Sequence, residues 1–527
     1  MIDDQRHSIV RASLNGKNAD TKIWVEFRAQ RGRVSGMTES SVNISSPPGG
    51  TGKVAEFLCV DLDGTILIGD SFWESFLLLV GAHPWYVFLI PFWLLRGKAA
   101  LKHEISRRVR LNVSTLPVRE ELIEFLRQQK LSGRQLILAT GADRKIAAGV
   151  AEHFGFFDVV LASDGATNLT GERKKEAIRE VVRGGSFDYV GNAKDDIPSW
   201  NAASTAILVG PSPGLLETVK KTSAVGGIIK SSTNYWGSLG RSLRPEHWIK
   251  NLLVFVPIVM AHELHDGVKL MHVVVTFVSF SLCASGVYLL NDLFDLEADR
   301  LHPKKKLRPL ASGALPVQMG LISAPLLMLA GFLVAAQLPT KLVWGTVFVY
   351  TAATTLYSTY VKRIPILDVL LLTGLYLIRI LGGGIAADVQ VSPWLIAFSM
   401  FLLLSLAFSK RQAELIDQTM AGEPQGIASK RGYREQDTAV LQQFGVTSGY
   451  LSVLVLALYV NGTDVTRLYR HPQVIWLACP MLLFWISRVW FLASRGKLSE
   501  DPVVFAARDP ISYLLGVIVL LILFVAS

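Results

Sequence analysis

Long apolar runs fill the second half of the chain, and no other feature limits its fold as strongly. Each run approaches the length that an α-helix needs to cross a bilayer. Hydrophobic residues make up 50% of the 527 residues and charged residues only 18%, so a soluble core could not bury them all. The runs lie near residues 250–263, 271–292, 317–338, 342–361, 365–383, 393–410, 444–461, 474–492 and 510–526. We therefore predict an all-α polytopic membrane domain of about nine transmembrane helices over residues 245–527.

The loops between these runs differ in charge. One alternate set of loops carries most of the lysines and arginines, including those at residues 300–308, and the positive-inside rule places that set in the cytoplasm. The chain before the first run lies on the same side. We expect a multi-pass protein of a bacterial-type inner membrane, with the N-terminal domain and the acid-rich loop in the cytoplasm.

The first half of the chain has a different pattern. Short apolar runs that end in Gly, Asp or Thr ("VAEFLCVDLDGT", "RQLILATGA", "FDVVLAS", "FDYVGNA", "TAILVGP") alternate with helical patterns such as "GERKKEAIREVV". This alternation indicates a parallel, Rossmann-type α/β sheet with crossover helices over residues 54–225. Residues 1–53 are polar and are predicted to form a flexible tail, and residues 226–244 a linker.

An acid-rich stretch, "NDLFDLEADRLHPKKKLRPLASG" at residues 291–313, follows the second apolar run. Asn291, Asp292, Asp295 and Asp299 share one broad face if this stretch is helical. Carboxylate and amide oxygens suit Mg²⁺, which bridges to substrate phosphates, and the following lysines and arginine could neutralise a diphosphate. A helix end whose charged side chains extend to the bilayer surface is the alternative explanation.

This stretch resembles the first aspartate-rich motif, NDxxDxxxD, of the UbiA superfamily of intramembrane prenyltransferases. "LRPEHWIKNLLVFVPI", "LYSTYVKRIPILDVL" and "FSKRQAEL" extend the resemblance over residues 240–527, toward its decaprenyl-phosphate phosphoribosyltransferase branch. The resemblance implies that Asn291, Asp292, Asp295 and Asp299 hold Mg²⁺ and a diphosphate, with catalysis centred on the three aspartates. It implies substrate binding by Lys250, Arg300, Lys304, Arg308, Tyr357, Lys362, Asp368, Lys410, Arg411 and Glu414.

The chain departs from the aromatic prenyltransferases of that superfamily. Those enzymes carry a second DxxxD motif, whereas this chain offers only "KRQAELID", with Glu414 and Asp417. One strong acidic motif favours phosphoribosyl diphosphate and a polyprenyl phosphate as substrates, and an aromatic prenyltransferase stays the alternative. For Lys362 a role in setting topology, and for Tyr357 a role as an interface anchor, are the structural alternatives.

A second candidate site begins at "VDLDGT". Asp61 and Asp63 follow an apolar strand and point the same way, and Gly64 lets the chain turn. The motif resembles the first motif of the haloacid dehalogenase (HAD) superfamily, and "LILAT", "GERKKEAI" and "VGNAKDDIP" follow in the family's order. The resemblance implies Asp61 as nucleophile, Asp63 as general acid and base, and Thr140 and Lys174 as phosphoryl ligands, with Lys175 a rival. Asp61, Asp63, Asn192 and Asp196 would hold Mg²⁺, Asn192 replacing the usual acid; a domain that folds without catalysing is the alternative.

Residues 72–95, "FWESFLLLVGAHPWYVFLIPFWLL", are long enough to span a membrane. A single crossing would separate Asp61 from Thr140, Lys174 and Asp196, and two prolines interrupt a straight helix. We expect an apolar cap or hairpin that enters the bilayer interface, with a buried cap helix as the alternative.

Together the two halves predict a two-step enzyme. The membrane half would form polyprenyl-phosphoryl ribose 5-phosphate, and the HAD half would remove the 5-phosphate. The alternatives are an aromatic prenyltransferase with an accessory HAD domain and, from another class, a HAD-linked membrane transporter, whose DKTGT motif differs from DLDGT. Neither nucleic acid nor a metal bound by the three scattered cysteines is expected, and the oligomeric state is left open.

Overall fold

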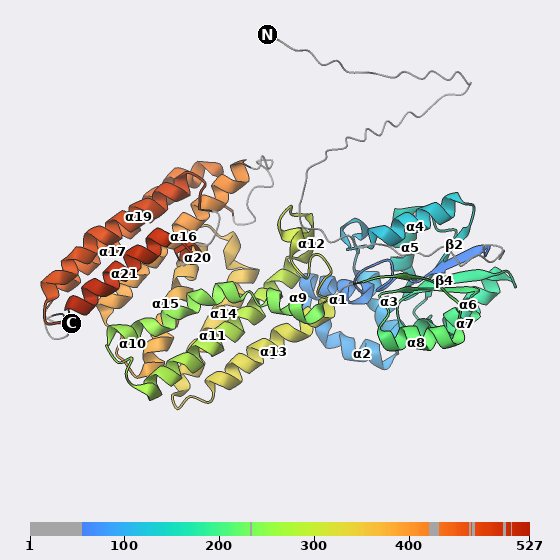
Figure 1. Cartoon of the computed structure of the whole chain (residues 1–527), viewed down its shortest axis with the longest axis horizontal. Helices are drawn as coiled ribbons and strands as arrows, with labels where there is room; N and C mark the ends of the chain where they lie inside the picture. Colours follow the sequence, from blue (N-terminus) through green and yellow to red (C-terminus); the bar gives the residue numbers. More distant parts are fainter. Residues whose placement is uncertain are drawn as a thin grey trace, which may run out of the picture. The chain divides into compact units, whose positions relative to one another are not determined.

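The computed structural model describes residues 55–231, 234–420, 432–462, 465, 469–498, 502–506 and 508–526 (Figure 1). The predicted tail at residues 1–53 lies outside the described residues. Within them, an α/β region comes first and a helical region follows, so the predicted fold class is confirmed in its two parts.

Six parallel strands form one sheet in the order β3-β2-β1-β4-β5-β6. The strands are β1 (Phe57–Val60), β2 (Gln135–Asp143), β3 (Val159–Ser163), β4 (Phe187–Gly191), β5 (Thr205–Val209) and β6 (Val225–Ile229). In register, Val60 of β1 lies opposite Leu138 of β2 and Val190 of β4. Since β1 is flanked by β2 on one side and β4 on the other, the strand order reverses beside β1, and such switch points open a crevice at the carboxyl edge.

Helices cover both faces of this sheet (Figure 1). Leu58, Val60 and Leu138 point to one face, where α4 and α5 pack, while Cys59 and Ile137 point to the other, where α6, α7 and α8 pack. This alternation follows from the period of two along a strand. The helices of this half are α1 (Ser71–Ala82), η1 (Pro84–Leu89), α2 (Ile90–Leu95), α3 (Lys98–Arg108), η2 (Val113–Thr115), α4 (Glu120–Leu131), α5 (Arg144–Phe154), α6 (Glu172–Val182), η3 (Lys194–Asp196), α7 (Ile197–Ala202) and α8 (Pro213–Thr222).

The sheet continues beyond residue 225, into the segment predicted to be a linker. β6 occupies Val225–Ile229, and α9 follows at Tyr235–Ser242. Two glycines make the strand signal weak in the sequence. The structure explains one of them, because a Cβ on Gly226 would lie 2.0 Å from Cγ2 of Thr205 on the neighbouring strand.

The second half is entirely helical among the described residues. Its helices are η4 (Pro245–Phe255), α10 (Val256–Met260), α11 (Gly267–Phe294), α12 (Leu296–Leu301), η5 (Lys305–Leu307), α13 (Val317–Ala335), α14 (Lys341–Thr359), η6 (Val361–Arg363), α15 (Leu367–Ala387), α16 (Pro393–Met420), η7 (Glu435–Asp437), α17 (Thr438–Val460), η8 (Pro472–Leu477), α19 (Ala478–Ser494), α20 (Pro502–Ala506) and α21 (Pro510–Ala526). Six helical segments are long and apolar enough to cross a membrane: Gly267–Phe294, Val317–Ala335, Leu367–Ala387, Pro393–Asp417, Glu435–Val460 and Pro472–Ser494. The predicted number of nine is therefore not confirmed.

The three remaining runs are helical but differ from a regular span. The first is broken into a 3₁₀ segment, η4, and a five-residue helix, α10, and the last, α21, has 17 residues. The third, α14, has 19 residues but carries several threonines, among them Thr351, Thr355 and Thr359. Their hydroxyls donate to carbonyls one turn back, which satisfies them inside the helix.

Residues 72–95 do not form one straight helix. α1 ends at Ala82, and Pro84 begins η1, after which Pro91 lies in the first turn of α2. Proline lacks the N–H that a helix interior needs, so the chain turns at these positions. α1 packs through Leu77 against Leu289 and Leu293 of α11, while η1 and α2 expose much of their apolar surface.

Candidate functional site

The carboxyl edge of the sheet gathers the residues singled out in the first half. Asp61 directly follows β1, Thr140 lies in the last part of β2, and Asn192 follows β4. Because these strands are neighbours and parallel, their ends meet beside the switch point. The turn after Asp61 needs glycine at residue 64, since φ is +71° and a Cβ would lie 2.1 Å from Nδ2 of Asn192.

Lys174 is the cation at the centre of this group. Its Nζ lies 2.9 Å from an oxygen of Asp61, 2.9 Å from an oxygen of Asp196 and 3.0 Å from the hydroxyl of Tyr189. Lys174 is buried, whereas its rival Lys175 forms an ion pair with the exposed Glu172. Asp196 also accepts hydrogen bonds from the backbone N–H groups of residues 192 and 193. The structure thus joins β1, α6 and the turn after β4 through one ammonium group.

Burial sets the proton affinity of the two aspartates. It raises the pKa of Asp61 to about 6, although Lys174 opposes the shift. It raises the pKa of Asp63 to about 7, with repulsion from Asp70 adding to the effect. Asp63 also accepts a 2.7 Å hydrogen bond from the backbone N–H of Ser71, at the start of α1. A carboxyl group with a pKa near neutrality can give and take a proton, which suits a general acid and base.

Replacing Lys174 with methionine tests this arrangement through stability. The change leaves two buried carboxylates facing each other without a cation, and loss of one partner of a buried pair costs about 3–5 kcal/mol. We expect a lower free energy of unfolding for K174M, measured by pulse proteolysis in urea. The matched variant K175M should change it by less than about 0.5 kcal/mol. Equal stability of the two variants would contradict the central place of Lys174.

In the second half, three aspartates on α11, α12 and the residue between them meet three cations from other segments. Asp292 accepts two hydrogen bonds from Nη2 of Arg244, at 2.5 and 2.7 Å. Nη1 of Arg308 lies 3.1 Å from Asp292 and 2.5 Å from Asp299. Nζ of Lys362 lies 2.9 Å from Asp295 and 3.2 Å from Oδ1 of Asn291. The formal charges of these three aspartates and three cations cancel.

A second network in this half ties α14, α15 and α16 together. Arg411 donates to Asp368 at 2.5 Å, to Glu414 at 2.6 Å and to the hydroxyl of Tyr357 at 2.6 Å. Tyr433 donates to the other oxygen of Asp368 at 2.6 Å and accepts from the backbone N–H of residue 366. Arg411 and Asp368 are fully buried, so each needs the other.

The remaining predicted ligands lie in three different settings. Lys250 is buried in η4, Lys410 precedes Arg411 on α16, and Lys304 is exposed in the loop before η5. The guanidinium group of Arg300 pairs with Glu74 of α1, whereas the ion pairs of the three aspartates are with Arg244, Arg308 and Lys362. Successive helix residues point about 100° apart, so Arg300 turns away from the side on which Asp299 meets Arg308.

Three residues of these sites escaped the sequence interpretation. Arg244 lies in the quoted stretch "LRPEHWIKN", but only the structure brings it to Asp292, 48 residues on. Tyr189 and Tyr433 place their hydroxyls on Asp196 and Asp368. A lone tyrosine carries no spacing signal, so these two could not be found from the sequence.

The oxygen atoms of both sites suit a Mg²⁺ ion that is bound by the protein and by a substrate phosphate together. Among the described residues, no group of three or more His, Cys, Asp or Glu side chains could hold a metal by itself. Instead, pairs of oxygens share one cationic nitrogen: Asp61 and Asp196 share Lys174, Asn291 and Asp295 share Lys362, and Asp292 and Asp299 share Arg308. Mg²⁺ is commonly held by one or two carboxylates plus phosphate oxygens, so these pairs fit it.

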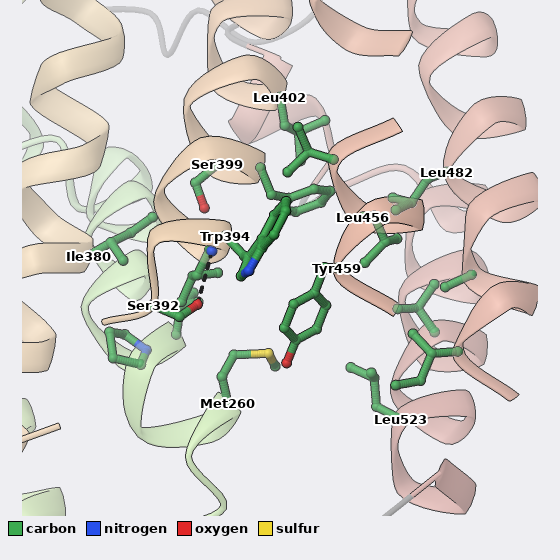
Figure 2. Close-up of a pocket in the computed structure, with 18 of the residues that line it drawn as sticks. Met260, Ile380, Ser392, Trp394, Ser399, Leu402, Leu456, Tyr459, Leu482 and Leu523 are labelled. Carbon is green, nitrogen blue, oxygen red and sulfur yellow. Dashed lines mark hydrogen bonds between the residues drawn. The ribbon is translucent and has the colours of Figure 1, made fainter. Parts of the chain in front are cut away.

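An apolar cavity of about 720 Å³ lies among α10, α15, α16, α17, α19 and α21. Figure 2 shows Met260, Trp394 and Tyr459 facing its interior. Leu456, Leu482 and Leu523 line the side formed by α17, α19 and α21. The lining on α16 ends near residue 403, eight residues before Arg411, which is about 12 Å along a helix. The cavity could hold a hydrocarbon chain whose polar end lies near Arg411.

A buried ion pair joins the two halves at the acidic motif. Glu74 of α1 accepts two hydrogen bonds from Arg300, at 2.6 and 3.1 Å, and both side chains are only 7% exposed. We expect E74Q or R300M to lower the free energy of unfolding by about 3 kcal/mol, because each leaves a buried charge unpaired. The exchange E74R/R300E should recover part of that loss. If E74R/R300E lowered the free energy of unfolding by as much as E74Q and R300M do together, the two side chains would not be coupled.

Comparison with known proteins identifies the second half. The model of the UbiA prenyltransferase family matches residues 252–508. The uncharacterised protein y4nM of Sinorhizobium fredii is 31% identical over 517 residues, which cover 95% of this chain and 97% of that protein. A decaprenyl-phosphate phosphoribosyltransferase of Mycolicibacterium smegmatis is 30% identical over 292 residues, 54% of this chain and 90% of that protein.

For the first half, a solved structure of phosphoserine phosphatase in its apo form is similar over 34% of this chain and 94% of that one, at 16% identity and a TM-score of 0.25. The alignment with y4nM covers both halves, so their combination in one chain recurs in that protein.

Proposed function

The chain belongs to the UbiA prenyltransferase family, and we propose that its membrane half transfers a phosphoribosyl group from phosphoribosyl diphosphate to a polyprenyl phosphate. The observation that carries the proposal is the cluster of Asp292, Asp295 and Asp299 with Arg244, Arg308 and Lys362. The similarity to decaprenyl-phosphate phosphoribosyltransferases supports this substrate pair over an aromatic acceptor.

The three cations of the cluster suit a diphosphate leaving group. Arg244 and Arg308 hold carboxylates in this structure, and a phosphate offers the same paired oxygens to a guanidinium group. Asp292, Asp295 and Asp299 would hold Mg²⁺, which would leave Arg244 and Arg308 available to the diphosphate of the substrate. Mg²⁺ would neutralise charge on the departing diphosphate.

The reaction exchanges one bond at the anomeric carbon of the ribosyl group. The bond to the diphosphate oxygen breaks, and a bond to an oxygen of the lipid phosphate forms. The lipid phosphate is already anionic, so no strong general base is needed. Arg411, whose guanidinium group donates to Tyr357, would bind the lipid phosphate with Lys410, the residue before it, while the cavity of about 720 Å³ takes part of the apolar chain. Positioning and electrostatic stabilisation would then supply most of the catalysis.

The α/β half would remove the 5-phosphate from the product. Asp61 attacks phosphorus, and Asp63 gives its proton to the departing ribose oxygen. Asp63 then takes a proton from the water that hydrolyses the aspartyl-phosphate. Lys174 and Thr140 bind the transferring phosphoryl group, with Asp61, Asp196 and Asn192 as metal ligands. We infer that both sites face the cytoplasm, because the basic loops and the Glu74–Arg300 contact lie on one side.

One incubation tests both halves. Purified protein in detergent receives Mg²⁺, a polyprenyl phosphate and labelled phosphoribosyl diphosphate, and the lipid products are identified by mass. A ribosyl-phosphoryl lipid without the 5-phosphate would support both steps, and the phosphorylated lipid alone would support only transfer. If no lipid product forms, while a polyprenyl diphosphate and an aromatic acid react, the aromatic prenyltransferase alternative is favoured.

A further inference from the structure

The segment after α1 exposes an unusual amount of apolar surface. The outward side chains range from 42% exposed at Leu89 to 86% at Leu95, and they are Trp85, Val87, Phe88, Leu89, Phe92, Leu94 and Leu95 of η1 and α2. Apolar side chains gathered in this way are rare on soluble domains and usually mark a binding surface.

This segment, residues 84–95, is held in place by a core of its own. Trp93 is buried with Leu79 and Ile105, and Tyr86 and Ile90 pack against the same cluster. The guanidinium group of Arg108 lies 4.7 Å from the ring centre of Trp93 and 5.3 Å from that of Tyr86. The inner side chains therefore fix the backbone, and the outer ones remain at the surface.

The position of α1 places this surface at the level of the membrane boundary. Leu77 of α1 packs with Leu289 and Leu293, which lie in the last two turns of α11, and with Ala324 of α13. Both α11 and α13 are long and apolar enough to span a bilayer. α1 therefore lies against spanning helices near the end that leads into the acidic motif, and residues 84–95 continue directly from it.

A second segment brings aromatic side chains out of the same cluster. Leu239 and Leu243, in and just after α9, pack against it, while Trp236 is 78% exposed and Tyr235 is 42% exposed. Tryptophan and tyrosine favour the boundary between hydrocarbon and water, where the ring is buried and its polar group stays hydrated.

The charged residues around positions 84–95 are mostly basic, although Arg96 also lies 3.8 Å from Glu104 and Lys102 donates to the carbonyl of residue 141. No Asp or Glu occurs between Glu74 and Glu104, whereas Arg96, Lys98 and Lys102 do. Arg96 and Lys98 are exposed directly after α2. Basic side chains beside an apolar interfacial segment attract anionic lipid headgroups.

We propose that residues 84–95, together with Trp236, lie in the interfacial zone of the bilayer that the second half spans, with a preference for anionic phospholipids. This surface would hold the α/β site at the membrane. Asp63 accepts a hydrogen bond from the backbone N–H of Ser71, the first residue of α1, and α1 is only about 18 Å long. A site so placed suits a phosphate group carried on a lipid. That consequence rests on the proposed function, whereas the membrane contact does not.

Fluorescence quenching in lipid nanodiscs tests the contact with the full chain. The three native cysteines are buried, so a cysteine at residue 95 or 131 can carry an environment-sensitive dye. The variants L95C and L131C are matched, because Leu95 and Leu131 are 86% and 87% exposed in the same half of the chain. Phe88→Cys and Trp236→Cys probe the rest of the surface.

We expect lipid-borne doxyl groups to quench the dye at residues 88, 95 and 236 at least about twofold more than at residue 131, and aqueous iodide to show the reverse order. Including phosphatidylglycerol in the phosphatidylcholine disc should increase the lipid quenching, and R96Q/K98Q should abolish that increase. Equal quenching at residues 95 and 131 in both discs would overturn the proposal. So would crosslinking between copies through residue 88 in place of lipid quenching, because a second copy would then cover the surface.

Discussion

Replacing Asp61 with asparagine is expected to lower phosphate hydrolysis by about 10³-fold or more, while ribosyl transfer continues. The amide has no charge with which to attack phosphorus, and it keeps the size of the side chain. The 5-phosphorylated lipid should therefore accumulate, and its mass distinguishes it from the dephosphorylated product. The hydrogen bond from Lys174 can still be accepted by the amide oxygen, so the fold should persist.

The D61N experiment has a control in the same site region. Lys175 forms an ion pair with Glu172 and not with Asp61, so K175M should leave the product mixture unchanged. Loss of transfer in a folded D61N protein would refute the division of labour between the two halves. Unchanged hydrolysis would mean that the α/β half does not use Asp61 as its nucleophile.

Replacing Asp295 with asparagine is expected to lower the transfer rate by about 10²- to 10³-fold, because the acidic motif loses one of the charged side chains proposed to bind Mg²⁺. Asp295 is better suited than Asp292 for this change. Asp292 is nearly buried between two arginines, and its removal would threaten the fold, whereas Asp295 is partly exposed and forms an ion pair with Lys362. The rate is measured with labelled phosphoribosyl diphosphate.

Glu297 supplies a matched control for D295N within the same motif. It is exposed, and its carboxylate accepts a hydrogen bond from Asn112 of the α/β half. E297Q makes the same acid-to-amide change two residues away and should retain most of the transfer activity. If D295N and E297Q were equally active, Asp295 would have no special role in transfer.

The sequence allowed the architecture to be predicted because its signals are local. In β1 to β5 a Gly or Asp is either the last residue of the strand or the residue directly after it, and the spacing of Asp61 and Asp63 places both at one strand end. The long apolar runs of the second half likewise predict helices. Most of β6 lies in the segment that the sequence predicts to be a linker, because its two central glycines weaken the strand pattern.

The partners of the site residues could not be predicted in the same way. Arg244 meets Asp292 only because η4 and α11 pack side by side, and Arg300 meets Glu74 across 226 residues. Which of several cations in a basic loop turns toward an acid depends on helix rotation, and a run such as "HPKKKLRP" does not reveal it. The pairing of Lys362 with Asn291 and Asp295 is of the same kind.

The placement of Arg244 and Arg300 bears on any attempt to produce the two halves as separate proteins. A membrane half that started at Pro245 would lose Arg244, and one of the two arginines on Asp292 would be missing. The same fragment would retain Arg300 without Glu74, which leaves a guanidinium group with no carboxylate next to the acidic motif. A fragment starting before residue 244 and carrying R300M would avoid both defects. The best point at which to divide the chain into two fragments therefore does not coincide with the point at which its sequence changes from polar to apolar.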